Sequence, residues 1–148
     1  MATVLIDTNV LVYLFDTHSP DKLARARAVL KALESQGEGC LSVQCLAEFV
    51  NASTRRLRPR LTPAQALVEV ELFQKTWPVF NLTPLIVIEA ARAVRDYQLA
   101  YYDAQIWATA RLNGVPVILS EDFQTGRTLE GVRFVNPFAD DFRLDEWL

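Results

Sequence analysis

The sequence predicts an α/β domain in which a central, mainly parallel sheet of four to five strands lies between layers of helices. Short β-branched apolar runs alternate along the chain with longer segments of helical periodicity. Strands that alternate with helices are joined by right-handed crossovers, which place helices on both faces of a parallel sheet. The chain has 148 residues, of which 51% are hydrophobic and 22% charged. We therefore expect a single domain, residues 1–148, with an ordinary core.

Five apolar runs are expected to form the strands. The first, residues 3–6, ends at the polar sequence Asp7-Thr8-Asn9, and a polar turn is a usual end for a buried strand. The fourth, residues 116–119, ends in the same way at Ser120-Glu121-Asp122. The remaining strands are expected at residues 39–42, 79–82 and 132–135.

Capping residues, prolines and glycines set the helix boundaries. Ser19-Pro20, Thr62-Pro63 and Thr83-Pro84 each place a capping residue before a proline at the first helical position. Gly37 and Asn113-Gly114 end helical patterns. We expect a short helix that follows the first strand and reaches residue 13 or 15, and further helices at residues 20–36, 43–58, 62–77, 84–98 and 102–112.

Composition excludes several classes of protein. The five glycines form neither G-x-G-x-x-G nor a P-loop, and the single histidine, His18, excludes zinc motifs that need two. Cys40 and Cys45 are expected to be buried thiols of a reduced, cytoplasmic protein. Because Asp7 interrupts the apolar N-terminal stretch, we expect neither a signal peptide nor a membrane span.

Acidic residues are expected at one edge of the sheet. Ligands of parallel α/β sheets bind beyond the carboxyl ends of the strands, where Asp7 and Asp122 follow the first and fourth strands. Asp103 shares a helix face with the apolar residues three, four and seven positions later, so that face is expected to be buried. Glu48 lies one turn into the helix after the second strand.

Each of these acids also has an ordinary structural explanation. Asp7 and Asp122 could serve turns, Asp103 could cap its helix, and Glu48 could lie on a solvated face beside Arg55. Taken together, however, four neighbouring carboxylates would repel each other unless a positive charge compensates them. Oxygen ligands suit Mg²⁺ or Mn²⁺, ions that activate water and neutralise charge on a phosphodiester. The set therefore indicates nuclease chemistry.

The ordered set of motifs resembles the PIN-domain ribonucleases and, more narrowly, the VapC-type toxins of type II toxin–antitoxin systems. The resemblance covers residues 1–138 and is carried by Asp7-Thr8-Asn9, Glu48 within Ala-Glu-Phe, Tyr102-Asp103-Ala104 and Ser120-Glu121-Asp122. It implies a PIN-like three-layer sandwich. It also implies a metal-dependent endoribonuclease that a protein antitoxin holds inactive and that is often a homodimer.

The resemblance also implies roles for individual residues. Asp7, Glu48, Asp103 and Asp122 would be the catalytic residues and the ligands of Mg²⁺ or Mn²⁺. Asn9 and Ser120 match polar positions that support the site. Glu121 is an additional acid beside the fourth position, and we expect Asp122 rather than Glu121 to face the metal.

An RNA substrate would need a local basic surface, because 15 Lys and Arg against 18 Asp and Glu give a net charge of −3. The strongest basic cluster is Arg55, Arg56, Arg58 and Arg60. Arg55 is the expected substrate contact, since arginine binds phosphate in a bidentate manner. A solvated helix end, favoured by the helix dipole, is the alternative for the other three.

Two other functions remain open at this stage. A phosphatase or phosphoacceptor of similar topology would use Asp7 as a nucleophile, although the haloacid-dehalogenase pattern needs an aspartate at the position of Asn9. A non-catalytic module would use the acidic pocket only to bind a metal or a partner. In the C-terminal tail, Phe142, Leu144 and Trp147 are expected to pack back on the domain, with partner docking as the alternative.

Overall fold

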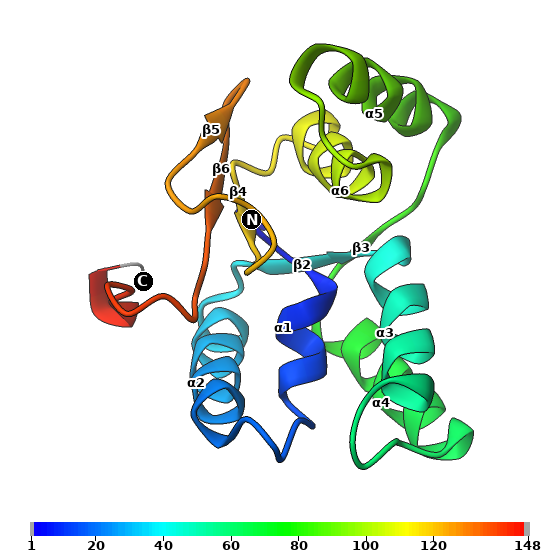
Figure 1. Cartoon of the computed structure of the whole chain (residues 1–148), viewed down its shortest axis with the longest axis vertical. Coiled ribbons are helices and arrows are strands. Elements are labelled where there is room, and N and C mark those ends of the chain that lie inside the picture. Colours follow the sequence, from blue (N-terminus) through cyan, green and yellow to red (C-terminus); the bar gives the residue numbers. More distant parts are fainter. Residues whose placement is uncertain (1, 147–148) are drawn as a thin grey trace.

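A six-stranded sheet forms the centre of the computed structural model, which describes residues 2–146 (Figure 1). The strand order is β3-β2-β1-β4-β6-β5, and all neighbouring strands are parallel except the β5–β6 pair. The strands are β1 (Val4–Ile6), β2 (Gly39–Ser42), β3 (Val79–Phe80), β4 (Val117–Leu119), β5 (Thr128–Leu129) and β6 (Val132–Val135).

The structure confirms the predicted α/β class and adds one strand to the expected four or five. The extra strand, β5, forms a hairpin with β6 through Glu130 and Gly131, whose φ angles of 46° and 86° are both positive. A two-residue connection of this kind matches the right-handed twist of an antiparallel pair. Sequence patterning did not reveal β5 because two residues are too few to show alternation.

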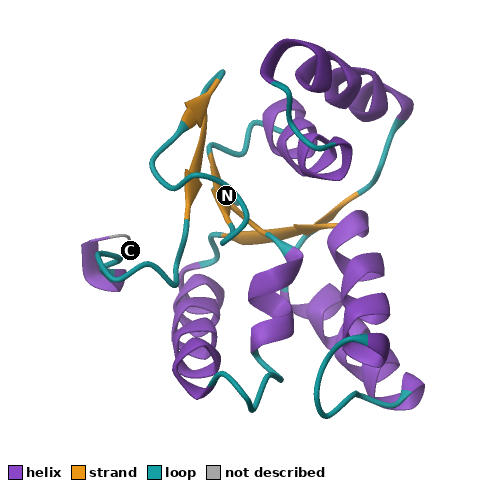
Figure 2. Cartoon of the chain, viewed as in Figure 1, coloured by secondary structure: helices purple, strands orange, loops and turns teal. Residues whose placement is uncertain are grey.

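Helices cover both faces of the sheet, which gives a three-layer sandwich (Figure 2). One layer contains α1 (Thr8–Tyr13), α2 (Pro20–Gln36), α3 (Val43–Arg55) and α4 (Pro63–Thr76). The opposite layer contains α5 (Pro84–Tyr97) and α6 (Tyr101–Leu112), and a short 3₁₀ helix, η1, spans Leu144–Glu146.

The helix boundaries agree with the expected capping signals in most places. Thr62 and Gln65 form the complete capping box of α4, whereas Ser19 precedes Pro20 without a side-chain capping bond. Helix α3 ends at Arg55, three residues before the predicted end at residue 58. The helix closes where the Arg56 and Leu57 N–H groups both donate to the Ala52 carbonyl, and the residue before Pro59 is itself disfavoured in the helical conformation.

Side chains of the central strands alternate between two hydrophobic cores. Leu5, Ile118 and Phe134 pack with α5 and α6, where Trp107 is fully buried. The residues that follow them in each strand, Ile6, Leu119 and Val135, pack with the helices of the opposite layer. This period of two is the expected pattern for strands buried on both faces.

The C-terminal tail packs on the second of these cores, as the sequence suggested. Phe142 is buried there and Leu144 is partly buried, whereas Trp147 lies outside the described residues. Cys40 and Cys45 are buried free thiols, as expected. Within residues 2–146, no helix is both long and apolar enough to cross a membrane.

The strand order places the ends of β1 and β4 side by side. Val4, Leu5 and Ile6 pair with Val117, Ile118 and Leu119 in parallel register. The Asp7 N–H continues this ladder by donating to the Leu119 carbonyl at 3.0 Å. After β1 the next strands, β2 and β3, are added on one side of it, and the later strand β4 is added on the other side. The strand order therefore reverses at β1, and ligands of such sheets bind at the carboxyl ends of the strands at this point.

Substitution Gly39→Ala is expected to destabilise the fold by about 1–3 kcal/mol, because the core beside β2 has no room for a methyl group. An ideal Cβ at Gly39 would lie 2.7 Å from Trp77 Nε1 and 3.2 Å from Ile6 Cδ1. Urea unfolding measures the loss. The loss should be smaller in a Trp77→Phe background, and an equal loss in both backgrounds would contradict the proposed steric cause.

Candidate active site

Asp7 is held at the junction of β1 and α1 by neutral donors. It caps α1, and its Oδ1 accepts from the Thr8 N–H at 2.7 Å. Its Oδ2 accepts from the Ser120 hydroxyl at 2.7 Å and lies 3.5 Å from the Asn9 amide nitrogen. Only 4% of the residue is exposed. A buried carboxylate whose hydrogen-bond partners are all uncharged suits the vicinity of a cation.

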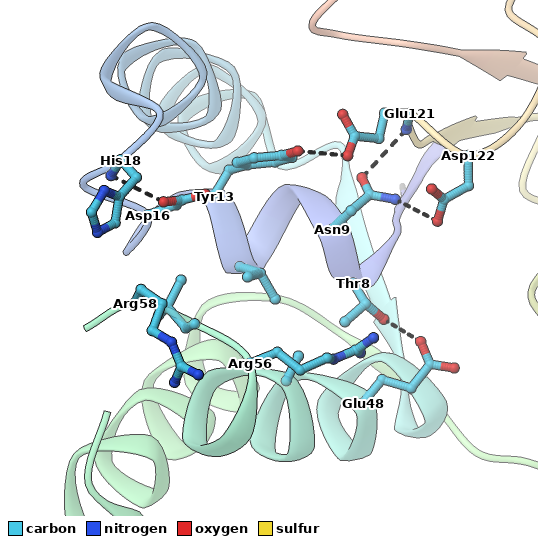
Figure 3. Close-up of a pocket in the computed structure, with 13 residues that line it drawn as sticks. Thr8, Asn9, Tyr13, Asp16, His18, Glu48, Arg56, Arg58, Glu121 and Asp122 are labelled. Carbon is cyan, nitrogen blue, oxygen red and sulfur yellow. Dashed lines mark hydrogen bonds between the residues drawn. The ribbon is translucent and has the colours of Figure 1, made fainter. Parts of the chain in front are cut away.

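Asn9 ties α1 to the loop after β4. Its Nδ2 donates to Asp122 Oδ2 at 3.1 Å, and its Oδ1 accepts from the Glu121 N–H at 3.3 Å (Figure 3). Its Nδ2 also donates to Ser120 Oγ at 3.0 Å. Ser120 Oγ in turn accepts from the Asp122 N–H at 3.0 Å. Asn9 and Ser120 therefore hold Asp122 next to Asp7, from a part of the chain more than a hundred residues away.

Glu48 lies on α3, and its side chain reaches Thr8, the residue next to Asp7. One carboxylate oxygen accepts from the Thr8 hydroxyl at 2.8 Å, and the other accepts from Gln44 Nε2 at 2.8 Å. Thr8 thus contacts two of the four acids, since its N–H binds Asp7 and its hydroxyl binds Glu48.

A chain of hydrogen bonds behind Glu48 connects α3 with the start of α6. Gln44 Oε1 accepts from Gln105 Nε2 at 2.8 Å, and Gln105 Oε1 accepts from the Tyr101 hydroxyl at 2.8 Å. Gln44 Nε2 also donates to the Tyr102 carbonyl at 3.0 Å. Both glutamines are buried, so this chain fixes the rotamer of Gln44 and through it the position of Glu48.

Asp103 lies in the first turn of α6 and is half-buried. Burial raises the pKa of its carboxyl, and the negative charges of Asp122 and Glu48 raise it further. The residue that caps α6 is Ala100. The alternative in which Asp103 caps its own helix is therefore not supported.

The four acids repel each other in the absence of a cation. Burial raises the pKa of the Asp7 carboxyl from 3.8 to about 7. Hydrogen bonds from Ser120 and Thr8 oppose this rise, and the charges of Asp122 and Glu48 add to it. The charges of Asp122 and Glu48 raise the pKa of Asp7 and also that of Asp103. The four acids are therefore close enough to act on one another electrostatically.

The donor set fits a hard divalent cation, although the acids are not gathered around a single point. Within residues 2–146, no group of three or more Asp, Glu, His or Cys side chains is arranged closely enough to hold a metal ion directly. Each of Asp7, Glu48 and Asp122 is instead held by its own neutral donor. Carboxylate oxygens are nevertheless the ligands that Mg²⁺ and Mn²⁺ prefer, with water completing the shell.

Glu121 and Asp122 point in different directions. Glu121 accepts from the Tyr13 hydroxyl at 2.7 Å and pairs with Lys22 at 2.9 Å, whereas Asp122 accepts from Asn9. The Lys22 ammonium also lies 4.7 Å from the centre of the Tyr13 ring. Glu121 therefore has a cationic partner, whereas the partner of Asp122 is neutral. That Asp122 rather than Glu121 faces the ion stays a prediction.

A cavity of about 660 Å³ opens beside the acids, and two arginines form part of its lining. Thr8, Glu48 and Asp122 are among the residues that line it, together with Arg56 and Arg58 (Figure 3). Arg55, the contact expected from the sequence, is exposed and does not line this cavity.

Helix geometry explains the difference. Successive residues of a helix are about 100° apart around its axis. Relative to Glu48, positions 52 and 56 therefore lie about 40° and about 80° around the axis in one direction, and position 55 lies about 20° in the opposite direction. Ala52 and Arg56 line the cavity with Glu48. The basic side of the cavity is therefore formed by Arg56 and Arg58.

Comparison with known families identifies the fold. The family model described as the PIN domain matches residues 4–128. The chain is a PIN-domain protein. The resemblance inferred from the sequence motifs is thereby confirmed at the level of the family, and PIN domains are nucleases that generally use divalent metal ions.

Solved structures show the same PIN fold. A toxin–antitoxin complex from Klebsiella pneumoniae has a TM-score of 0.67 and 20% identity, covering 91% of this chain and 98% of that one. DNA-bound VapBC from Salmonella typhimurium gives 0.66 and 21%, covering 90% and 97%. VapC20 of Mycobacterium tuberculosis, a toxin that cleaves the sarcin–ricin loop, gives 0.60 and 16%, covering 78% and 86%. A search of curated proteins found no match.

The raised pKa of Asp7 predicts how the stability of the metal-free protein depends on pH. The folded state holds a proton on Asp7 that the unfolded state releases above about pH 4, so the free energy of unfolding falls as the pH rises through about 7. Asp7→Asn lacks this titration. Relative to the wild type it should gain up to about 4 kcal/mol between pH 4 and pH 8.

Urea unfolding in the presence of EDTA at several pH values measures this difference. A difference between Asp7→Asn and the wild type that stays constant from pH 4 to pH 8 would show that Asp7 does not titrate in this range.

Proposed function

We propose that this PIN-domain protein is a metal-dependent endoribonuclease of the VapC toxin type, which hydrolyses RNA phosphodiesters with Mg²⁺ or Mn²⁺. The observation that carries the proposal is the buried Asp7 carboxylate, which has only neutral hydrogen-bond partners and shares its surroundings with three further acids. Asp7, Glu48, Asp103 and Asp122 would hold the ion.

The chain's own residues would prepare the site for this reaction. A bound Mg²⁺ or Mn²⁺ supplies a nucleophilic water and offsets the negative charge that develops on the phosphodiester. Thr8 holds Glu48 in place, and Asn9 and Ser120 hold Asp122 and Asp7. These donors keep the carboxylates on the same side of the sheet edge, and the side chains would move closer together as an ion binds.

A protein antitoxin, a homodimeric state and a cytoplasmic location belong to the same proposal. The folds of this chain and of proteins in a toxin–antitoxin complex and a VapBC complex are alike over 90% or more of the chain. The nuclease of such a pair must be blocked by its partner until it is needed, so an antitoxin that covers the acidic edge would complete the system.

The phosphatase alternative is less well supported by the geometry. A haloacid-dehalogenase type phosphatase uses one aspartate as the nucleophile and a second aspartate two residues later. Asn9 occupies the position where the haloacid-dehalogenase pattern has a second aspartate, and it already binds Asp122.

Asp7→Asn should reduce Mn²⁺-dependent cleavage of single-stranded RNA by at least about a hundredfold, because it removes one charge from the ion's ligands. Cleavage of a labelled RNA measures the loss. Growth inhibition on expression without the antitoxin should disappear in the same variant.

The circular dichroism spectrum of Asp7→Asn should match that of the wild type, since asparagine can keep the cap of α1. Full cleavage by a folded Asp7→Asn protein would exclude the proposed function. Metal-dependent stabilisation of the wild type without any RNA turnover would favour the non-catalytic binding module.

Gln105→Leu is expected to weaken Mn²⁺ binding about tenfold, because Gln44 loses a donor and Glu48 loses its fixed position. Titration of Mn²⁺ by calorimetry measures the affinity. Thr109→Val is the matched control, since Thr109 is buried on the same helix and donates only to the Gln105 carbonyl. An equal loss of affinity in both variants would indicate a general effect of destabilising α6.

A further inference from the structure

Acidic, basic and apolar side chains all line the cavity beside the carboxylates. In Figure 3 the Arg56 side chain extends toward Thr8 and Glu48, whereas Arg58 lies on the side of Asp16 and His18. The other lining residues are Asn9, Val12, Tyr13, Ala52, Leu57, Glu121 and Asp122. A volume of about 660 Å³ lies in the usual range for a site that takes one small organic group, about 300–1,000 Å³.

The two arginines have no competing partner inside the protein. Both are exposed, and within residues 2–146 neither guanidinium forms a hydrogen bond or an ion pair. Arg92, in contrast, forms ion pairs with Glu89 and Glu130. On a chain of net charge −3, two free guanidinium groups beside a set of carboxylates mark a local site for an anion.

We propose that this cavity binds the nucleotide that flanks the scissile phosphate of a single-stranded RNA. Arg56 and Arg58 bind the next phosphate along the strand, and the apolar lining contacts the ribose and base between the two phosphates. The assignment rests on the proposed ribonuclease function and adds to it the position of the substrate strand.

The combination of lining groups favours RNA over a protein segment. A strand of RNA carries phosphates, ribose and bases, and the cavity offers two guanidinium groups and apolar side chains beside the carboxylates. Guanidinium groups bind phosphate oxygens with paired hydrogen bonds. Unstacked bases in single-stranded RNA are free to contact apolar side chains, which paired bases are not.

The test compares arginines that differ in position alone. Arg56→Ala and Arg58→Ala should each raise the KM for a single-stranded oligonucleotide about ten- to a hundredfold with little change in kcat, the loss expected for a charged hydrogen-bonded pair. Each should also lower the salt dependence of binding by about one phosphate contact. Arg60→Ala, which removes the same charge from an exposed residue outside the lining, should change KM less than twofold.

A modified substrate tests the phosphate contact directly. Once the cleavage position is mapped, a neutral methylphosphonate replaces each phosphate next to the cut in turn. At one of these positions the wild type should lose as much affinity as the double variant Arg56→Ala/Arg58→Ala, and the double variant should lose almost nothing further. Additive losses at both positions would overturn the assignment.

These experiments distinguish a failure of the cavity assignment from a failure of the proposed ribonuclease function. Absence of metal-dependent cleavage by the wild type would overturn both. Cleavage by the wild type with Arg56→Ala and Arg58→Ala indistinguishable from Arg60→Ala would overturn only the assignment of the cavity. Loss of antitoxin binding in these variants with RNA binding intact would likewise overturn it, because the cavity would then belong to the partner protein.

Discussion

The buried carboxylate of Asp7 is the constraint on which the rest of the site depends. Parallel pairing of β1 with β4 places this residue against Ser120, and the two are joined by a 2.7 Å hydrogen bond. Burial alone raises the pKa of an aspartate, and the charges of Asp122 and Glu48 raise that of Asp7 further. A bound cation would keep such a carboxyl ionised at neutral pH. The burial that raises the pKa of Asp7 is therefore also what favours a cation beside it.

Neutral hydrogen-bond donors decide how the acids are arranged. Thr8, Asn9 and Gln44 each hold one or two carboxylates without neutralising them. A lysine in any of these positions would lower the repulsion and remove the need for an ion. Lys22, in contrast, is a cation and is paired with Glu121. Glu121 therefore has a cationic partner, whereas Asp7, Glu48 and Asp122 accept hydrogen bonds from neutral donors.

The fold and the positions of the acids near one sheet edge could be predicted from the sequence because both follow from local patterns. Apolar runs that end in Asp7 and Asp122 gave the strands and their carboxyl ends, and two parallel strands bring such ends to one edge. The hairpin strand β5 could not be predicted, because two residues carry no periodicity. Helix periodicity placed Arg55 on the same stripe as Glu48, but Arg56 rather than Arg55 lines the cavity together with Glu48.

Contacts between distant parts of the chain could not be predicted. Lys22 and Glu121 are separated by 99 positions, and Gln44 and Gln105 by 61, and no local pattern signals either pair. Gln44 does precede Glu48 by one helical turn, which made their contact expected in principle. Charges from four segments act on one another only after the sheet has formed, so the raised pKa of Asp7 is a property of the fold.

A crystal structure of the protein soaked with Mn²⁺, with the ion located by its anomalous scattering, tests the central claim most directly. The account predicts an ion bound to an Asp7 oxygen at about 2.0–2.3 Å and shared with at least one other acid of the quartet. Mn²⁺ absent from Asp7 at saturating concentration, or bound only at surface acids elsewhere, would contradict it.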